Sequence, residues 1–300
     1  MEILIWIGAA SPIALLFLLI GLFRVRTEKA ALTGLIAAVF LSIWVGQSDL
    51  KIAGIDLCKG MFSALNILLV IWPAISLYQI MDAAGAFRGI CRFLRKKTED
   101  QLMLILLIGW LFSSFLQSIT GFGVPVAVCA PMLIALGVSP LWSVTVTLLG
   151  HAWANTYGTF ALAWNALISQ SETAQLFFVR VWSGALLWAV DVIGALLICW
   201  FYGRWKAVRH MLPFVLVIST IHGCGQLLFS FFNSSIASFL PTAAALLAAW
   251  GILGVGFYKK KWKYTSKLVT LWKASVQNDS GGSTKASLLP FGILAGTSVL

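Results

Sequence analysis

A helix-breaking motif lies within a long apolar stretch, where residues 120–125 read TGFGVP. Two glycines and a proline this close together interrupt a helix, and the interruption leaves backbone amides without intrahelical partners. Free N–H groups at the start of the second arm, together with the helix dipole, suit a carboxylate. Pro125 fits the first turn of that arm, because a proline there removes no hydrogen bond. The motif therefore predicts an anion-binding break.

Polar side chains beside the break extend this candidate site. Ser118 and Thr120 bring hydroxyl groups, and Gln117 brings an amide. An alternative interpretation is a glycine-rich packing interface between helices, which requires no ligand. Under the first interpretation the substrate contacts are Ser118, Thr120, Gly121, Phe122, Gly123, Val124 and Pro125.

A second polar cluster lies in residues 148–165, which read LLGHAWANTYGTFALAWN. On one continuous helix His151, Asn155 and Thr159 share a face, and this face should point into the protein because polar groups are costly in hydrocarbon. We expect His151, Asn155 and Thr156 to complete the substrate pocket. Histidine exchanges a proton near neutral pH, so His151 is also a candidate proton carrier. The alternative is a ladder of interhelical hydrogen bonds.

A single carboxylate, Asp191, lies in the middle of the apolar run LLWAVDVIGALL. An acidic residue within a membrane span is a functional candidate by default, for example as a proton carrier, and the alternative is a structural hydrogen bond to a neighbouring helix. His222 and Gln226 share a face of the run 211–232 and rank below His151 as candidates.

The composition places these groups in a membrane. The 300 residues are 60% hydrophobic and only 10% charged, whereas a soluble domain carries roughly 25% charged residues. A water-soluble fold of this size leaves about a quarter of its chain surface exposed and could not hide so much apolar surface. The bilayer is therefore the expected solvent.

The other composition signals exclude several classes of protein. The net charge of +11 comes from short basic clusters between apolar runs, which indicate membrane topology rather than nucleic-acid binding. The five cysteines are scattered and no metal-binding spacing is present, so we expect no metal site and no cofactor. The sequence also lacks the paired carboxylates or the nucleophile–base set that would indicate an enzyme.

Apolar runs of spanning length predict an all-α polytopic membrane protein with about 8–10 transmembrane helices. The run 102–137 is too long for one span, and the glycine–proline motif makes it a broken or re-entrant hairpin. The expected runs are 3–23, 30–46, 61–81, 102–137, 140–168, 179–202, 211–232, 235–257 and a shorter one at 288–300.

The basic residues predict the orientation. With the N-terminus outside, 18 of the 21 lysines and arginines lie on the inner side, as the positive-inside rule requires. This places the chain in the plasma or inner membrane of the cell as a multi-pass protein, with a cytoplasmic basic loop at 258–287. The stretch 102–137 must then begin and end on the inside, which favours a hairpin.

The segment 117–168 carries a set of recognisable elements. They are Gly121-Phe122-Gly123-Val124-Pro125-Val126-Ala127, Ala130-Pro131, Gly150-His151-Ala152-Trp153 and Tyr157-Gly158-Thr159. In these elements the chain resembles the lactate permease family of secondary transporters. The resemblance implies proton symport of a 2-hydroxy monocarboxylate such as lactate or glycolate, and a fold with re-entrant hairpins and two related halves. Family members often have an acidic or small residue where this chain has Gln117 to Thr120.

Members of that family are commonly near twice this length, so the chain, expected as a single membrane domain over 1–300, resembles their N-terminal half. Our main hypothesis is a proton-coupled secondary carrier of small monocarboxylates, with Asp191 or His151 carrying the proton. Its partners would be a small organic anion, a proton and membrane lipids, and either a second half-transporter or another copy of the chain. The alternative is a truncated, non-transporting membrane subunit, or half of a split carrier.

Overall fold

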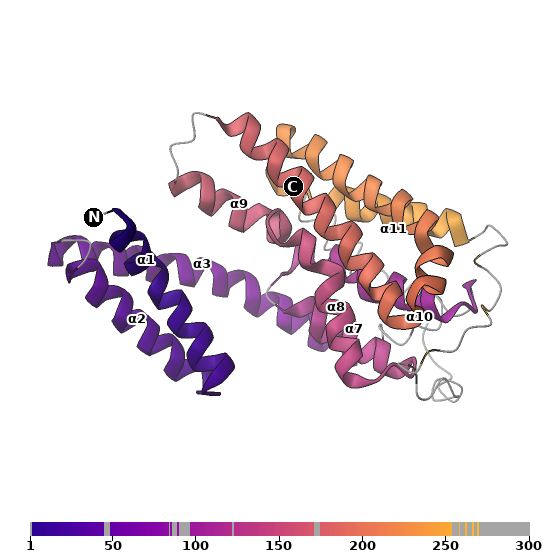
Figure 1. Ribbon diagram of the computed structural model, residues 1–300, viewed down its shortest axis with the longest axis horizontal. Coiled ribbons are helices and arrows are strands. Elements are labelled where there is room, and N and C mark those ends of the chain that lie inside the picture. Colours follow the sequence, from indigo (N-terminus) through magenta and orange to yellow (C-terminus); the bar gives the residue numbers. More distant parts are fainter. Residues whose placement is uncertain are drawn as a thin grey trace. The chain divides into compact units, whose positions relative to one another are not determined.

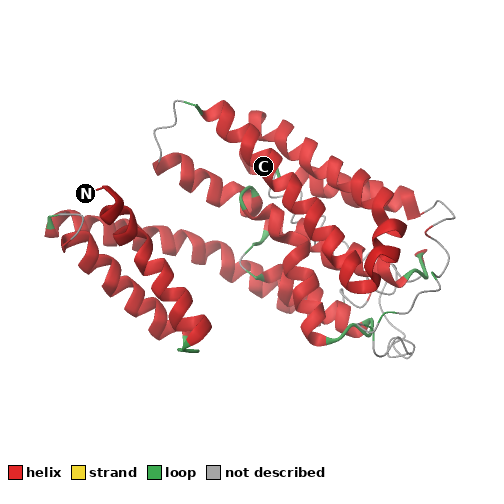
Figure 2. Cartoon of the chain, in the orientation of Figure 1, coloured by secondary structure: helices red, strands yellow, loops and turns green. Residues whose placement is uncertain are grey.

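The computed structural model describes residues 2–44, 49–83, 85, 89, 97–121, 123–170, 175–253, 258, 262, 266 and 269. Helices account for nearly all of this part of the chain (Figure 2). The β-pairing within it is an isolated antiparallel bridge between Val138 and Val269. The prediction of an all-α polytopic membrane protein is confirmed. Two compact units, Met1–Leu69 and Val70–Leu300, make up the fold.

The first unit consists of apolar helices. Its elements are α1 (Glu2–Phe17), the π-helical turn η1 (Leu18–Leu22), α2 (Thr27–Trp44) and the first part of α3 (Leu50–Ala83), which begins well before the run predicted at 61. Leu16 packs 3.0 Å from the position that a Cβ on Gly34 would take, which brings α1 close to α2. Large side chains such as Phe17 and Trp44 are more than 70% exposed, which suits a surface solvated by lipid.

The second unit contains the remaining elements, several of them labelled in Figure 1. They are α5 (Gln101–Leu106), the π-helical segment η2 (Leu107–Phe112), α6 (Ser113–Ile119), α7 (Val124–Ala135), α8 (Pro140–His151), the 3₁₀ turn η3 (Ala152–Asn155), α9 (Gly158–Gln170), α10 (Leu176–Phe232), η4 (Ser234–Ile236) and α11 (Phe239–Leu253).

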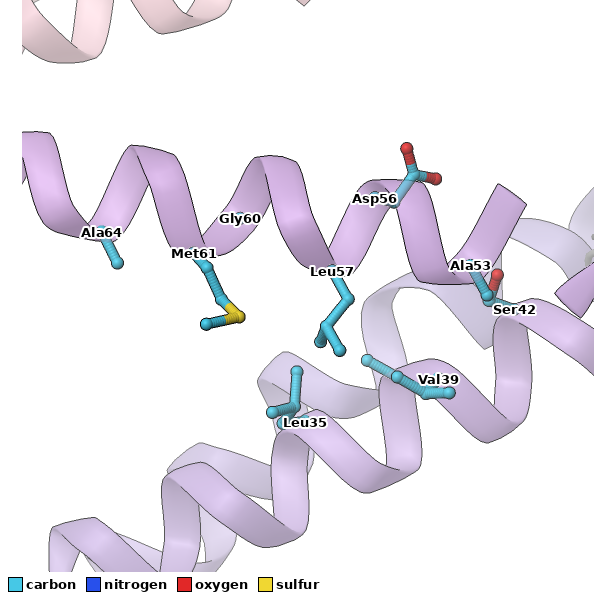
Figure 3. Close-up of a pocket in the computed structure, with 10 residues that line it drawn as sticks. Leu35, Val39, Ser42, Ala53, Asp56, Leu57, Gly60, Met61 and Ala64 are labelled. Atoms are coloured by element: carbon cyan, nitrogen blue, oxygen red, sulfur yellow. The ribbon is translucent and has the colours of Figure 1, made fainter. Parts of the chain in front are cut away.

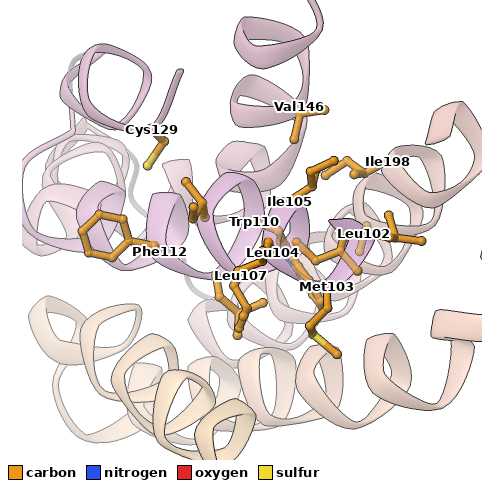
Figure 4. Packing of buried hydrophobic residues seen from close by; sticks show 14 of the residues in the cluster. Leu102, Met103, Leu104, Ile105, Leu107, Trp110, Phe112, Cys129, Val146 and Ile198 are labelled. Carbon is orange, nitrogen blue, oxygen red and sulfur yellow. The ribbon is translucent and has the colours of Figure 1, made fainter. Parts of the chain in front are cut away.

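A buried central helix organises this unit. Elements α5, η2 and α6 form one helix, Gln101–Ile119, and its whole apolar window is buried. A helix that is apolar on every face requires neighbours on every face. In Figure 4 its side chains pack among those of neighbouring helices, including Cys129 of α7, Val146 of α8 and Ile198 of α10. Asp100 caps the start of the helix by accepting hydrogen bonds from the first-turn amides.

Four helices in the described part of the chain are long and apolar enough to cross a bilayer. They are Thr27–Trp44, Gln101–Ile119, Leu176–Phe232 and Ser234–Leu253.

Helix α7 returns alongside the central helix. Leu133, near the end of α7, lies 3.3 Å from the position of a Cβ on Gly109 in η2. At 1.5 Å per residue the twelve residues of α7 reach about 18 Å, well short of a bilayer core of about 30 Å. The chain therefore enters along α5–α6, turns at 120–123 and runs back along α7.

The prediction of one continuous helix over 140–168 is wrong. Helix α8 ends at His151 and is followed by the 3₁₀ turn η3. Thr159, Phe160 and Ala161 then adopt left-handed backbone conformations, with φ of 49°, 54° and 61°. Gly158 and the polar residues before it are poor helix formers, and they allow this interruption. His151, Asn155 and Thr159 consequently do not share one helical face.

Helix α10 folds back on itself at a kink. Gly203 and Arg204 leave helical geometry, with Arg204 at φ 54°, and divide α10 into a first arm (176–202) and a second arm (205–232). The arms run antiparallel, because Gly184 lies against Leu227 and Gly223 lies against Trp188. The predicted spans 179–202 and 211–232 thus meet at a tight reversal. The run 288–300 and most of the loop predicted at 258–287 lie outside the described residues.

Candidate functional site

The two helix interruptions, at 120–123 and 152–161, lie against each other. Gly121 has a φ of +60°, and a Cβ there would collide with the hydroxyl of Thr159. Both residues are buried. Glycine is required at Gly121 for two reasons, the left-handed backbone and the absence of space for a side chain.

A side-chain hydrogen bond joins the same two regions. The amide Nε2 of Gln117, at the end of α6, donates to Oδ1 of Asn155 in η3 at 2.8 Å. Gly158 also approaches closely, since its Cβ position lies 2.9 Å from the carbonyl oxygen of Gln117. Backbone groups freed by each broken helix therefore border the other break. Gln117, Gly121 and Thr159 are buried there, whereas Asn155 is exposed.

The predicted hydroxyl groups are already engaged with their own helix. Ser118 donates to the carbonyl of Phe115 at 2.6 Å, and Thr120 donates to that of Leu116 at 2.8 Å. The Ser118 oxygen also lies 3.3 Å from the hydroxyl of Thr242 in α11, which donates to it. In this conformation the two residues present oxygen atoms to the break, and donors for an anion must come from backbone or amide groups.

Helix α7 begins directly at the break. Gly123 has a φ of +84° and is exposed, with open space around its Cβ position. Val124 and Pro125 follow as buried first-turn residues, and the Val124 amide bonds the carbonyl of Gly121 at 3.0 Å. The positive end of the α7 dipole therefore points toward the break. Phe122 lies outside the described residues.

A buried cluster surrounds the mid-span carboxylate. Trp110 Nε1 donates to Oδ1 of Asp191 at 2.6 Å, and Nδ1 of His222 lies 3.0 Å from Oδ2. The side chains of Asp191 and His222 are fully buried. Both oxygens of the carboxylate are thus bonded by side chains from other helical segments, which is how an acid becomes tolerable inside a membrane.

Aromatic stacking links this cluster to the second break. The ring of Trp153, in η3, stacks on His222 with centroids 4.5 Å apart. The indole of Trp153 also donates to the hydroxyl of Ser114 at 2.9 Å, and Ser114 donates to the carbonyl of Gly150 at 3.0 Å. The carboxylate–imidazole pair therefore contacts the segment whose backbone leaves the helix.

Several buried polar atoms near the second arm of α10 have no hydrogen-bond partner among the described residues. An unmade hydrogen bond of a buried group costs about 1–3 kcal/mol, and native proteins contain few of them. The atoms are Nδ1 of His151, Nε of Arg180, the hydroxyls of Ser219 and Ser238, Nε2 of His222, and both amide atoms of Gln226.

Comparison with known proteins identifies the family. The family model described as L-lactate permease matches residues 6–300. The chain belongs to the L-lactate permease family. This is a family of membrane permeases and not of enzymes, and the resemblance seen in residues 117–168 is confirmed over nearly the whole chain.

Individual members of the family are distant in sequence. The L-lactate permease of Halalkalibacterium halodurans is 27% identical over 85% of this chain and 48% of its own length. The glycolate permease GlcA of Escherichia coli is 26% identical over 85% of this chain and 45% of its own length. The L-lactate permease of Streptococcus iniae is 33% identical over 51% of this chain and 33% of its own length. This permease-family chain thus spans about half the length of the curated relatives it matches. No solved structure matches it.

A pocket in the first unit of this permease-family chain is a poor anion site. In Figure 3, Leu35 and Val39 of α2 face Leu57 and Met61 of α3. The lining also contains a carboxylate, that of Asp56, which would repel an anion. Among the described residues, no group of three or more His, Cys, Asp and Glu side chains is placed to bind a metal ion.

Two residues around the buried carboxylate of this permease-family chain are more important than their sequence context indicates. His222 ranks below His151 on sequence grounds, and Trp110 does not stand out among the apolar residues around it. In the structure, the side chains of His222 and Trp110 both hydrogen-bond to the carboxylate of Asp191. Two signals pointed that way: a mid-span acid requires a partner, and His222 and Gln226 are spaced by four residues on one face of an apolar helix.

Proposed function

We propose that this chain takes part in carrying small monocarboxylates, such as L-lactate or glycolate, across the plasma or inner membrane of the cell together with protons. The observation that carries the proposal is the contact between two helix breaks, at 120–123 and 152–161, which is partly buried. Discontinuous helices of this kind form substrate sites in many secondary transporters. The names of the curated relatives, lactate and glycolate permeases, agree with this substrate class.

The substrate carboxylate would bind at the break that precedes α7. Residues 117–127 and 148–165 contain no lysine or arginine, so the positive end of a helix dipole has to replace a cationic side chain. The binding residues would be Ser118, Thr120, Gly121, Phe122, Gly123, Val124, Pro125, His151, Asn155 and Thr156.

The coupled proton would be carried by the pair of Asp191 and His222, with His151 as a further candidate. When Asp191 is ionised, Nδ1 of His222 donates to it, and Nε2 is left as a lone-pair acceptor. A carboxylate that accepts a hydrogen bond from an imidazole in this way favours one tautomer of the ring. The stack of His222 on Trp153 brings this acceptor beside the second break.

The proposed orientation has the N-terminus outside. Thr98, His210 and Tyr258 contact one another through two hydrogen bonds, from Thr98 to the Tyr258 carbonyl and from Tyr258 to the His210 carbonyl. Each of these residues borders a basic segment. The three residues lie close together, which agrees with a single cytoplasmic face beside them.

Transport by purified protein tests the proposal. The chain would be reconstituted into liposomes, and labelled L-lactate uptake would be measured with the external solution more acidic than the lumen. We expect accumulation that collapses when a protonophore removes the gradient. Uptake that does not respond to the gradient would contradict the proposed proton coupling. The absence of any uptake would contradict the proposed function.

A glycine pair tests the site. In Gly121→Ala the new methyl group meets Thr159, and the left-handed backbone adds about 1–2 kcal/mol of strain. We expect uptake to fall by roughly 100-fold, the scale on which small misplacements act. In Gly123→Ala the strain remains but the space is open, so the loss should be smaller. Gly54→Ala, on exposed α3, is the control and should transport normally. Equal uptake by all three variants would exclude this site.

A further inference from the structure

We infer that Gln226 is the residue by which the substrate site distinguishes a 2-hydroxy acid from a plain monocarboxylate. The inference rests on the proposed function and adds a specificity-determining residue to it. The second arm of α10 presents this side chain toward the two breaks, beside His222.

The side chain of Gln226 is buried and unsatisfied. The residue is fully buried, and neither Nε2 nor Oε1 of its amide has a hydrogen-bond partner among the described residues. By contrast, Gln117 and Gln101, on the central helix, each use their amide in a side-chain hydrogen bond. An amide held in the interior with both a donor and an acceptor free is equipped to bind a ligand that offers both.

The neighbours of Gln226 along the helix show which way it faces. His222, one turn earlier, stacks on Trp153. Ser230, one turn later, lies beside Tyr157. Residues four apart share a helical face, so Gln226 faces the stretch between those two contacts. That stretch contains Asn155, which binds Gln117 across the two breaks.

The packing of α11 also places Gln226 at the same height along the packed helices as the first break. Gly225 packs against Pro241, with 2.8 Å between its Cβ position and the proline ring. Thr242, the next residue of α11, donates its hydroxyl to Ser118 at 3.3 Å. Three segments therefore meet at one height along the helices: the second arm of α10, the start of α11 and the end of α6. Gln226 lies at this height.

The chemistry of a glutamine amide matches a 2-hydroxy acid. A carboxylate only accepts hydrogen bonds, so it can pair with the NH₂ group of Gln226 but not with the carbonyl Oε1. A 2-hydroxyl group supplies the missing donor to Oε1. Propionate has no hydroxyl and would leave Oε1 unpaired. Sites built to bond a substrate hydroxyl discriminate strongly against analogues that lack it.

Equilibrium binding tests the role of Gln226 without requiring transport. The full chain in lipid nanodiscs would bind labelled L-lactate, and unlabelled L-lactate and propionate would compete for the site. We expect the wild-type chain to prefer lactate by roughly 10-fold or more. Gln226→Met should lower lactate affinity to near that of propionate. Propionate affinity should change by less than about 2-fold, because removal of the unpaired Oε1 offsets loss of the NH₂ partner.

A matched control separates a specific role from a structural one. Gln101→Met makes the same exchange at a buried glutamine of the central helix whose amide oxygen accepts from Tyr202. It should keep the preference for lactate. If Gln226→Met does not fold, Gln226→Asn, which withdraws the amide by one methylene, should show the same selective loss of lactate affinity.

The outcomes separate the two proposals. A wild-type chain that binds lactate, with Gln226 variants that retain its preference or lose both ligands equally, overturns the role of Gln226 and leaves the proposed function standing. A wild-type chain that binds neither acid overturns the proposed function and this inference with it.

Discussion

Two aspartate–histidine pairs in the second unit have nearly the same geometry but different surroundings. Asp191 and His222 are 3.0 Å apart, and Asp100 and His210 are 2.9 Å apart. The second oxygen of Asp191 accepts from the indole of Trp110, and Nε2 of His222 has no partner among the described residues. In the other pair, the second oxygen of Asp100 caps the amide groups at the start of α5.

Asp100 and His210 form a pair whose surroundings indicate a structural role, and we call this pair the clasp. His210 stacks on Trp262 with centroids 4.6 Å apart, and its carbonyl accepts from the hydroxyl of Tyr258. Burial raises the pKa of that hydroxyl, so it remains a donor at neutral pH. This pair therefore ties α5, the second arm of α10 and the segment after α11 together. The role of an aspartate–histidine pair therefore depends on which of its atoms are left without a partner, and not on the bond between the two side chains.

Replacing the carboxylate beside the breaks should have the largest effect. Asp191→Asn retains the size and the acceptor for Trp110 but cannot bind or release a proton. We expect proton-driven lactate uptake to fall by roughly 100-fold or more, within the range contributed by acid–base groups. Lactate exchange across membranes at equal pH should persist. Asp56→Asn, in an exposed pair with Lys59, is the matched control and should transport normally. Full gradient-driven uptake by Asp191→Asn would remove the distinction between the two pairs.

Replacing the imidazole of that pair should have the next largest effect. His222→Phe keeps an aromatic ring for the stack on Trp153 but leaves Oδ2 of Asp191 without its partner. We expect roughly 10-fold slower uptake with a flattened dependence on pH, and a stability loss of about 1–3 kcal/mol. Uptake measured from pH 5 to 8 provides the test. An unchanged pH profile would show that His222 has only a structural role.

Removing the acid of the clasp should affect stability rather than transport. Asp100→Ala deletes both the helix cap and the bond to His210, so we expect a loss of about 1–2 kcal/mol in thermal or denaturant unfolding. Asp100→Asn should lose less, because asparagine caps helices as well as aspartate does. Uptake per folded molecule should stay near normal in both variants. A transport defect as large as that of Asp191→Asn would mean that the two pairs act together.

The smallest effect is expected at the histidine of the clasp. His210→Gln can still donate to Asp100 but loses the stack on Trp262. Unfolding should become easier by at most about 1 kcal/mol, and uptake should keep its normal pH dependence. A changed pH profile in this variant, with an unchanged one in His222→Phe, would reverse the roles assigned to the two pairs.

Composition and local chemistry are enough to establish the class of protein and the first helix break. A chain that is 60% hydrophobic and 10% charged must have lipid around it, and this follows from composition alone. Residues 120–125 interrupt a helix by local chemistry, because glycine supplies left-handed backbone and proline fits a helix start. The mid-span position of Asp191 was also enough to mark it as a candidate.

The combination of these groups into one site depends on how the helices pack in three dimensions. The second break, at 152–161, uses left-handed Thr159, Phe160 and Ala161, which have no intrinsic preference for that conformation. Contacts between residues far apart in the chain, such as Gln117 with Asn155 and Asp191 with His222, hold the groups together. Local propensity does not encode such pairings, because they depend on which helix faces are brought together when the chain packs.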